Sequence, residues 1–272
     1  MLRQNYPFVR FIQSCKNLGF AKGNNLAFQS SRGRNLLFLN PDTEIKGKAI
    51  HEMYIQLESL PKVGVVGPKL LNTDRTIQTT CIRAFPGIMN QMLESDVLRR
   101  WFPRSRFWGA ELLFAEGERP KKVDAVSGAS LMIKRSVFEK VERFSPDYYM
   151  YSEDVDLCFK VREAGWETQY IPKAIVVHHG GSSSSQSKSN LLSSVMMLES
   201  RWRFFRKTRS LWYCGLYRIA ISISILVRMA VLAVMCPALS MHVRSPRFRS
   251  ALRKWSARLR WAMGGERWVK DF

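Results

Sequence analysis

A carboxylate lies directly after a short apolar run near the start of the chain. Residues 35–39 predict a strand buried on both faces, and Asp42 follows it in the Asn-Pro-Asp-Thr turn of residues 40–43. Ligands bind at the carboxyl ends of strands in open α/β sheets. A carboxylate there can hold Mg²⁺ or Mn²⁺ together with a substrate phosphate. The structural alternative is that these residues simply form a turn followed by a helix cap.

A second acidic segment opens a predicted helix. Glu153, Asp154 and Asp156 come directly after the aromatic residues 148–151. A carboxylate beside such an apolar wall can have its pKa raised toward that of a general base. Favourable interaction of acidic residues with the helix dipole is the competing explanation for the same segment.

Two further segments could contact an anionic ligand. The histidine pair 178–179 ends an apolar strand and runs into glycines, so His178 could bind a metal or contact a phosphate. A histidine pair at a strand end is also a common surface feature. The Asn/Gly-rich residues 17–25 run into a helix, whose N-terminus suits an anion. That pattern alone matches neither the Walker motif nor the dinucleotide-binding fingerprint.

The elements that carry these residues alternate along the first 180 positions. Strand-like and helix-like stretches in turn favour a layered α/β domain with a largely parallel sheet. A hairpin is expected over residues 70–80, and residues 83–118 show no clear period. The expected strands cover residues 8–12, 35–39, 63–66, 123–133 and 167–177, and the expected helices reach to about residue 31 and cover 51–60, 136–141 and 155–164.

Composition places the chain among globular proteins. It has 272 residues, of which 46% are apolar and 24% charged, which excludes a disordered chain and a polytopic membrane protein. Its five cysteines are widely spaced, which argues against a disulfide framework and for a reducing compartment. The low-complexity residues 180–190 predict a boundary between a domain over residues 1–190 and a tail over residues 191–272.

The net charge of +21 belongs mainly to that tail. Residues 201–272 hold 16 basic and two acidic side chains, so the partner is expected to be an acidic membrane surface or nucleic acid. Residues 211–241 are apolar, but Arg228 brings their insertion across a bilayer close to break-even. A pair of helices that lies in the membrane plane or is re-entrant at its cytoplasmic face, or a soluble helical hairpin packed on the domain, fits the same residues. The helix expected over residues 245–263 has an apolar stripe typical of a membrane interface.

Several motifs in one order resemble the family-2 glycosyltransferases. They are Asn-Leu-Gly-Phe-Ala-x-Gly-Asn-Asn, Leu-Asn-Pro-Asp-Thr, Val-Ser-Gly-Ala-Ser-Leu-Met-Ile-Lys-Arg, Tyr-Ser-Glu-Asp-Val-Asp-Leu-Cys, Gly-Trp and His-His-Gly-Gly-Ser, within residues 5–210. The group they resemble most is the rhamnosyltransferase-like enzymes of bacterial cell-surface polysaccharide assembly. The resemblance implies a GT-A (Rossmann-like) fold and inverting transfer of a sugar from a nucleotide-diphosphate sugar to an acceptor hydroxyl.

The resemblance also implies roles for individual residues. Asp154 matches the base that deprotonates the acceptor, with Glu153 beside it, and Asp42 matches the acid that binds Mg²⁺ or Mn²⁺. Asn40 stands where many members have a first Asp, and His178 matches the histidine near the metal and diphosphate. The residues that match the donor-binding segments are Asn17, Gly19, Asn24, Asp42 and Gly128.

The resemblance starts only near Tyr6, without the family's first strand and its acidic turn that binds the nucleotide base. Such a chain is expected to have an unpaired sheet edge and to transfer sugar poorly by itself. The expected acceptor is a glycan or lipid-linked glycan at the cytoplasmic face of the plasma membrane. The alternative from another class is a basic nucleic-acid-binding protein that uses Trp202, Phe204, Phe205 and the Arg-rich tail.

Overall fold

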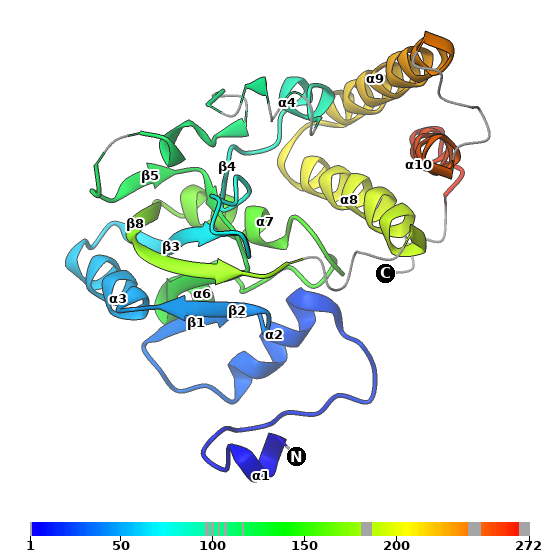
Figure 1. Cartoon of the computed structure of the whole chain (residues 1–272). Coiled ribbons are helices and arrows are strands. Elements are labelled where there is room, and N and C mark those ends of the chain that lie inside the picture. Colours follow the sequence, from blue (N-terminus) through cyan, green and yellow to red (C-terminus); the bar gives the residue numbers. More distant parts are fainter. Residues whose placement is uncertain are drawn as a thin grey trace.

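The computed structural model describes residues 2–95, 98, 101–102, 104–105, 108–115, 117–180, 187–238 and 246–266. Figure 1 shows an α/β domain with a layer of long helices beside it. The main sheet has the strand order β1 (Asn35–Leu39), β7 (Ser130–Lys134), β3 (Val63–Leu71), β8 (Glu167–His178) and β2 (Thr43–Lys46), with β5 (Lys121–Val123) also on β8. A separate pair joins β4 (Ile82–Arg83) to β6 (Ala125–Val126).

The sheet is mixed rather than mostly parallel. β1 and β3 each pair antiparallel with β7, and β2 and β5 pair antiparallel with β8. Only β3 and β8 form a parallel pair among the described strands. Nevertheless β1, β3 and β8 all run in the same direction, because β7 lies between β1 and β3. The α/β class is confirmed. The expectation of a mostly parallel sheet was wrong about pairing, because β7 is inserted antiparallel between β1 and β3 and the strands β2 and β5 pair antiparallel with β8.

The domain helices lie on both sides of this sheet. They are α2 (Gly19–Gln29), α3 (Ala49–Ser59), α6 (Arg135–Lys140) and α7 (Glu153–Glu163), with short elements α1 (Leu2–Asn5), α4 (Ile88–Met92) and the 3₁₀ helix η2 (Glu111–Leu113). α3 packs on β3 and β8 through the buried Met53 and Leu57. On β3, Val63, Val65 and Val66 are all fully buried, so this strand is covered on both faces as expected.

β1 differs from β3 because it is an edge strand. Leu36 and Phe38 are buried, but Leu39 is 38% exposed and the strand is therefore buried on one face only. No described strand pairs with its outer edge. The strand predicted over residues 8–12 is absent, and Phe8 is 85% exposed. Without a neighbouring strand to accept its backbone hydrogen bonds, that segment cannot form a ladder.

One further prediction was wrong in detail and another is confirmed. Residues 123–133 do not form one strand, because a turn separates β6 from β7. The hairpin expected over residues 70–80 is confirmed as a tight turn, in which Gln78 N donates to Leu70 O and Leu71 bridges Ile77. The segment over residues 83–118, which has no clear period, contains β4, α4 and η2 among its described residues.

The described residues of the C-terminal part form three helices: α8 (Ser187–Thr208), α9 (Leu211–Ala238) and α10 (Pro246–Ala262). α9 and α10 correspond to the helices expected there, and α10 ends before Gly264 as predicted. Residues 181–186 of the expected linker lie outside the described residues, and α8 already begins at Ser187. α8 packs on the domain, because Ser200 Oγ donates to Met150 O (2.8 Å) and Lys207 pairs with Asp147 (2.8 Å).

Candidate functional site

The predicted site residues gather at one edge of the sheet. β1, β3 and β8 end at this edge, and the antiparallel β7 begins there. The backbone N–H of Asn40 donates to Ala129 O at 2.9 Å, so the turn after β1 adjoins the turn before β7. The carboxyl ends of the strands are therefore brought together, even though the strand between β1 and β3 runs in the opposite direction.

Asp42 and His178 lie side by side at this edge. His178 Nε2 is 3.4 Å from Asp42 Oδ1 and 3.4 Å from Asn40 Nδ2. The other ring nitrogen, Nδ1, lies 3.0 Å from Gln78 Oε1. Because an amide oxygen only accepts, that contact makes Nδ1 the donor to Gln78, while Nε2 faces Asp42. Gln78 thus orients the imidazole.

Gln78 was missed by sequence reasoning, which treated residues 70–80 only as a hairpin. Gln78 follows β3 along the chain. Together with the turn over residues 72–74, His178 and His179, Gln78 lines a cavity of about 480 Å³. A polar residue just beyond the end of a central strand is the signal that could have identified it.

The chemistry of these side chains fits a hard divalent cation. Among the described residues there is no cluster of three or more His, Cys, Asp or Glu side chains, so the protein offers the Asp42 carboxylate and the His178 imidazole. Mg²⁺ commonly binds through one or two carboxylates and completes its shell with waters and substrate phosphates. Hydrogen bonding of the second histidine nitrogen, as Gln78 makes here, is the usual support of a metal-binding histidine.

Asp154 lies in the first turn of α7 and is only 6% exposed. Its Oδ2 accepts a hydrogen bond from Gly128 N at 2.9 Å, and its Oδ1 lies 3.7 Å from Arg83 Nη1. A side chain at position 128 would press on Asp154 Cβ and the Phe20 ring, at 3.3 and 3.2 Å. Gly128 therefore allows its backbone to approach the carboxylate, while its predicted contact with the donor remains a prediction.

The chain is strained immediately before this turn of helix. Tyr151 and Ser152 both have positive φ, 71° and 65°. Non-glycine residues in this region cost about 1–3 kcal/mol and concentrate at functional sites. The backbone here presents Glu153 and Asp154 at the start of α7.

The three carboxylates of this segment have different surroundings. Asp156 accepts hydrogen bonds from Ser145 Oγ (2.6 Å) and Tyr148 OH (3.2 Å), so it joins α7 to the preceding loop. Glu153 is buried, and its Oε2 has no hydrogen-bond partner among the described residues. Burial, together with the charge of Asp154, raises the pKa of Glu153 to about 8. The raised pKa expected of this segment therefore belongs to Glu153.

The Asn/Gly-rich loop packs against the same segment. Asn17 Oδ1 accepts from Gly19 N at 2.9 Å, and Phe20 N donates to Tyr149 O at 3.1 Å. Gly19 has φ +71°, and a Cβ there would collide with Tyr149 O. Asn24 donates instead to Phe20 O within its own helix, at 2.9 Å. This loop is thus joined to the start of α7, and the donor-binding roles of Asn17, Gly19 and Asn24 remain predictions.

Comparison with known families decides the identity. The family model described as "Glycosyltransferase like family 2" matches residues 3–202 of this chain. The chain belongs to glycosyltransferase family 2. The matched part of the chain includes both the Asp42–His178 and the Gly128–Asp154 contacts.

Curated relatives of the glycosyltransferase carry related names. An N-acetylglucosaminyl-diphospho-decaprenol L-rhamnosyltransferase of Mycobacterium tuberculosis is 29% identical over 188 residues, which cover 64% of this chain and 60% of the relative. The rhamnosyltransferase WbbL of Escherichia coli is 24% identical, over 64% of this chain and 66% of the relative. The match thus spans about three fifths of the first relative's length.

Solved structures show the same fold. The mannosyltransferase PcManGT from Pyrobaculum calidifontis, in complex with GDP-Man and Mn²⁺, superposes with a TM-score of 0.53 at 13% identity and covers 96% of this chain and 71% of that one. GalNAc-T7 with UDP, GalNAc and Mn²⁺ gives a TM-score of 0.51 at 14% identity over 73% of this chain and 37% of that one. These likenesses confirm the GT-A architecture of the glycosyltransferase.

Arg83 is a second residue that sequence reasoning missed. It lies in the segment without periodicity, on β4, which pairs with β6 so that Arg83 stands opposite Ala125. It borders cavities of about 300 and 160 Å³ in the glycosyltransferase, next to Asp154. A lone arginine in an irregular stretch carries no signal of such a contact, because only the β4–β6 pairing brings it there.

The aromatic residues that the nucleic-acid alternative requires for base stacking are packed against other parts of the protein. Phe204 and Phe205 are fully buried in the helical part of the glycosyltransferase, where Phe204 packs on Phe159 and Phe205 on Tyr217. Trp202 lies under the guanidinium of Arg218, at 4.7 Å. Aromatic rings used this way cannot form an open platform for bases. The interleaved aromatic pattern is therefore core packing.

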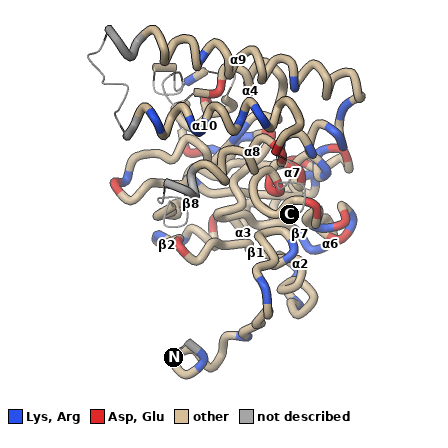
Figure 2. The backbone as a smooth tube through the Cα atoms, turned by 90° about the vertical axis from the view of Figure 1, so that its right-hand side faces the viewer, with Lys and Arg blue, Asp and Glu red and all other residues tan. Residues whose placement is uncertain are grey.

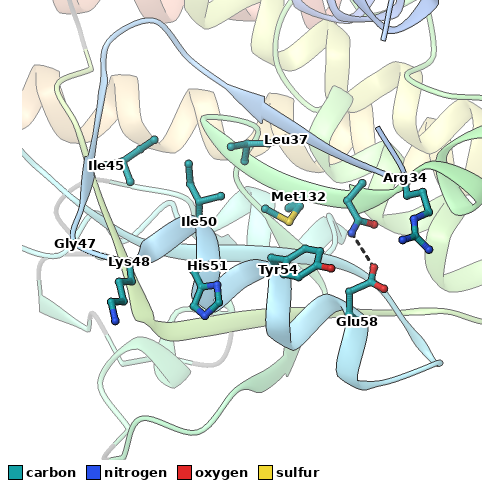
Figure 3. Close-up of a pocket in the computed structure, with 11 residues that line it drawn as sticks. Arg34, Leu37, Ile45, Gly47, Lys48, Ile50, His51, Tyr54, Glu58 and Met132 are labelled. Carbon is teal, nitrogen blue, oxygen red and sulfur yellow. Dashed lines mark hydrogen bonds between the residues drawn. The ribbon is translucent and has the colours of Figure 1, made fainter. Parts of the chain in front are cut away.

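A larger cavity, of about 740 Å³, lies away from these residues (Figure 3). α3, β1, β2 and β7 line it, with apolar walls from Leu37, Ile50, Tyr54 and Met132. Its carboxylate, Glu58, accepts a hydrogen bond from Asn35 Nδ2 at 2.7 Å. None of the residues predicted for catalysis, metal or donor lines it. This cavity is therefore separate from the residues predicted for the reaction.

Proposed function

We propose that this glycosyltransferase moves a rhamnose-like hexose, with inversion, from a nucleotide-diphosphate sugar to a hydroxyl of a lipid-linked or cell-surface glycan. The observation that carries the proposal is Asp154, held between Gly128 N–H and Arg83 at the sheet edge where Asp42 meets His178. The names of the curated relatives support a lipid-linked acceptor, since one of them acts on an N-acetylglucosaminyl-diphospho-decaprenol.

Asp154 would act as the general base. Its carboxylate takes the proton of the acceptor hydroxyl while that oxygen attacks the anomeric carbon of the donor sugar. The bond from that carbon to the diphosphate oxygen breaks with its electron pair, and the nucleoside diphosphate departs. The Gly128 N–H and the Arg83 guanidinium hold the carboxylate in place without protonating it. A single displacement of this kind inverts the anomeric centre.

Asp42 and His178 would hold the cation at the opposite end of the reaction. Mg²⁺ or Mn²⁺ bound there neutralises negative charge that develops on the leaving diphosphate. Gln78 fixes the ring orientation of His178, and the cavity of about 480 Å³ beside it leaves space for a ligand. The titles of both structural neighbours name Mn²⁺ and a nucleotide or nucleotide sugar, which supports this set of ligands.

The place of action would be the cytoplasmic face of the plasma membrane. A lipid-linked acceptor is embedded in the bilayer, and the excess of 16 basic over two acidic residues in positions 201–272 favours an anionic surface. The division into a catalytic domain over residues 1–190 and a basic, membrane-associating tail over 191–272 belongs to this proposal.

Asp154→Asn tests the reaction. The full chain is incubated with Mn²⁺, a panel of radiolabelled nucleotide-diphosphate sugars and membranes that contain lipid-linked glycan, and label in the lipid fraction is counted. Loss of a general base lowers the rate by about 10²–10⁴-fold, while donor binding in Mn²⁺ persists. Glu163→Gln, an exposed carboxylate at the other end of α7, is the matched control and keeps the wild-type rate. Wild-type transfer by Asp154→Asn contradicts the assignment.

A further inference from the structure

The outward face of α9 is apolar along almost its whole length. The exposed residues between positions 211 and 234 include no charged side chain. They recur at spacings of three and four, so they form one stripe along the helix. Trp212 at its start is 86% exposed and Val234 at its end 73%. The large apolar residues exposed on this helix are Leu211, Trp212, Leu216, Ile219, Ile223, Leu226, Val227, Val231 and Val234.

The opposite face of α9 packs against other helices of the protein. Arg218 Nη2 donates to Trp261 O (3.1 Å), and Arg228 Nη2 donates to Met92 O (2.8 Å). The guanidinium of Arg228 also lies over the Trp255 ring, at 5.2 Å. Through these contacts and the buried Ile221 and Ile225, α9 packs on α4, α8 and α10.

This asymmetry argues against a membrane crossing. Over Leu211–Val234, α9 is long and apolar enough to cross, with a mean hydropathy of 1.9, and its length is about 36 Å. A crossing helix, however, would have to pull Arg218 and Arg228 away from their carbonyl partners and place them in hydrocarbon. Because one face of α9 packs against protein, only the exposed apolar stripe on the other face is available to contact lipid.

Exposed basic residues lie on the helices that pack beside α9. Figure 2 shows Lys and Arg recurring along α10, beside the mostly uncharged α9. Arg206 and Arg209 at the end of α8 are exposed, as are Arg249 and Arg253 on α10. An apolar face next to exposed cations is complementary to a bilayer with acidic headgroups.

We propose that α9 is an in-plane docking helix, whose stripe enters the headgroup–acyl boundary of an acidic bilayer while the neighbouring arginines contact lipid phosphates. The proposal rests on the membrane partner given under the proposed function, but it holds whether or not the chain transfers sugar. Because Ser200 and Lys207 of α8 bond to the loop over residues 147–150, a docked α9 holds the α7 end with Asp154 at a constant height above the membrane.

Vesicle flotation tests the surface. The full chain is mixed with vesicles of phosphatidylcholine alone or with phosphatidylglycerol, and the floating fraction is measured at low and high salt. The wild type floats with the acidic vesicles, and high salt weakens this binding. The double variant Ile219→Asn/Ile223→Asn lowers the partition coefficient between acidic vesicles and water by about tenfold or more. Ile55→Asn, an equally exposed isoleucine on α3, is the control and leaves the partition unchanged. Unchanged thermal midpoints of the variants show that they fold.

A depth measurement separates docking from crossing. In a Cys15→Ser/Cys236→Ser background, Leu216→Cys, Ile223→Cys and Val234→Cys each carry an environment-sensitive fluorophore, and lipids with quenchers at known depths report its position. The in-plane helix places all three labels at the same shallow depth. A deep label at position 223 between shallower ones overturns the proposal, since it indicates a crossing. The proposal is also overturned if the wild type sediments as a dimer without lipid and the stripe variant does not. Equal flotation of the wild type and the double variant would overturn it as well.

Discussion

The guanidinium of Arg83 lies 3.7 Å from the Asp154 carboxylate, which also accepts a hydrogen bond from Gly128 N. These two contacts have a common origin. Arg83 is on β4, β4 pairs with β6, and Gly128 lies two residues beyond the end of β6. One small antiparallel pair therefore holds the proposed base from two sides.

Arg83→Gln is expected to lower kcat/KM by up to about fivefold, because a partly exposed ion pair contributes up to about 1 kcal/mol. Arg83→Lys keeps the charge but loses the planar fork, so it recovers part of the rate. Steady-state sugar transfer measures both. Lys122→Gln, which borders one of the same cavities but pairs with Glu167, is the control. Equal loss in the Lys and Gln variants would indicate that charge at this position is unimportant.

Gln78→Ala should weaken Mn²⁺-dependent binding of a nucleoside diphosphate by about 10–100-fold. The reason is that His178 loses the partner of its Nδ1, 3.0 Å away, which fixes the ring. Calorimetric titration with and without Mn²⁺ measures the effect. Thr73→Ala, which removes a contact to the neighbouring His179, is the matched control. Identical affinities for Gln78→Ala and wild type would remove Gln78 from the proposed metal site.

The raised pKa of Glu153 predicts that the free energy of unfolding depends on pH. Burial raises the pKa of its carboxyl from 4.5 to about 8, so the folded state binds this proton more tightly than the unfolded chain. Its contribution to the free energy of unfolding is complete below pH 4.5 and is lost as the pH rises through about 8. Glu153→Gln removes the titration. Thermal midpoints measured between pH 5 and 9 should therefore fall less in this variant than in wild type.

The control for that measurement is Glu163→Gln, whose carboxylate is exposed on the same helix. It should follow the wild-type curve. Parallel curves for Glu153→Gln and wild type would mean that Glu153 does not titrate in this range.

Two glycines of α2 should respond oppositely to alanine. Gly19→Ala forces a Cβ into Tyr149 O at φ +71° and should lower the free energy of unfolding by at least about 1 kcal/mol. Gly23 has nothing within 4 Å of its added Cβ. Gly23→Ala should therefore raise the free energy of unfolding by about 0.5–1 kcal/mol through helix propensity. Urea denaturation of both variants measures the difference, and equal effects would contradict the packing of Gly19 on the α7 loop.

Local patterns were sufficient to predict several elements. The apolar run at β1, the long strand at β8 and the helix that Gly165 follows are confirmed close to their expected bounds. Side-chain periodicity and turn residues act over a few positions, so such elements can be recognised without knowing their neighbours. The order of the family motifs likewise identified the family, since motif order is a property of the sequence itself.

Pairing partners could not be predicted in this way. The antiparallel insertion of β7 between β1 and β3, and the failure of residues 8–12 to form a strand, both depend on which segments lie next to each other. Strand propensity is largely a measure of fit to neighbouring strands and covering side chains. An apolar segment without a neighbour therefore remains outside the sheet, as the exposed Phe8 does.

For this protein, the sequence alone determined the family, the α/β class, and Asp42, Asp154 and His178 as the residues to test. Only the tertiary structure decided that Arg83 and Gln78 contact them, that the raised pKa belongs to Glu153, and that the arginines of α9 face protein. Contacts, burial and electrostatic environment arise between segments that are distant along the chain, so no local pattern of residues contains them.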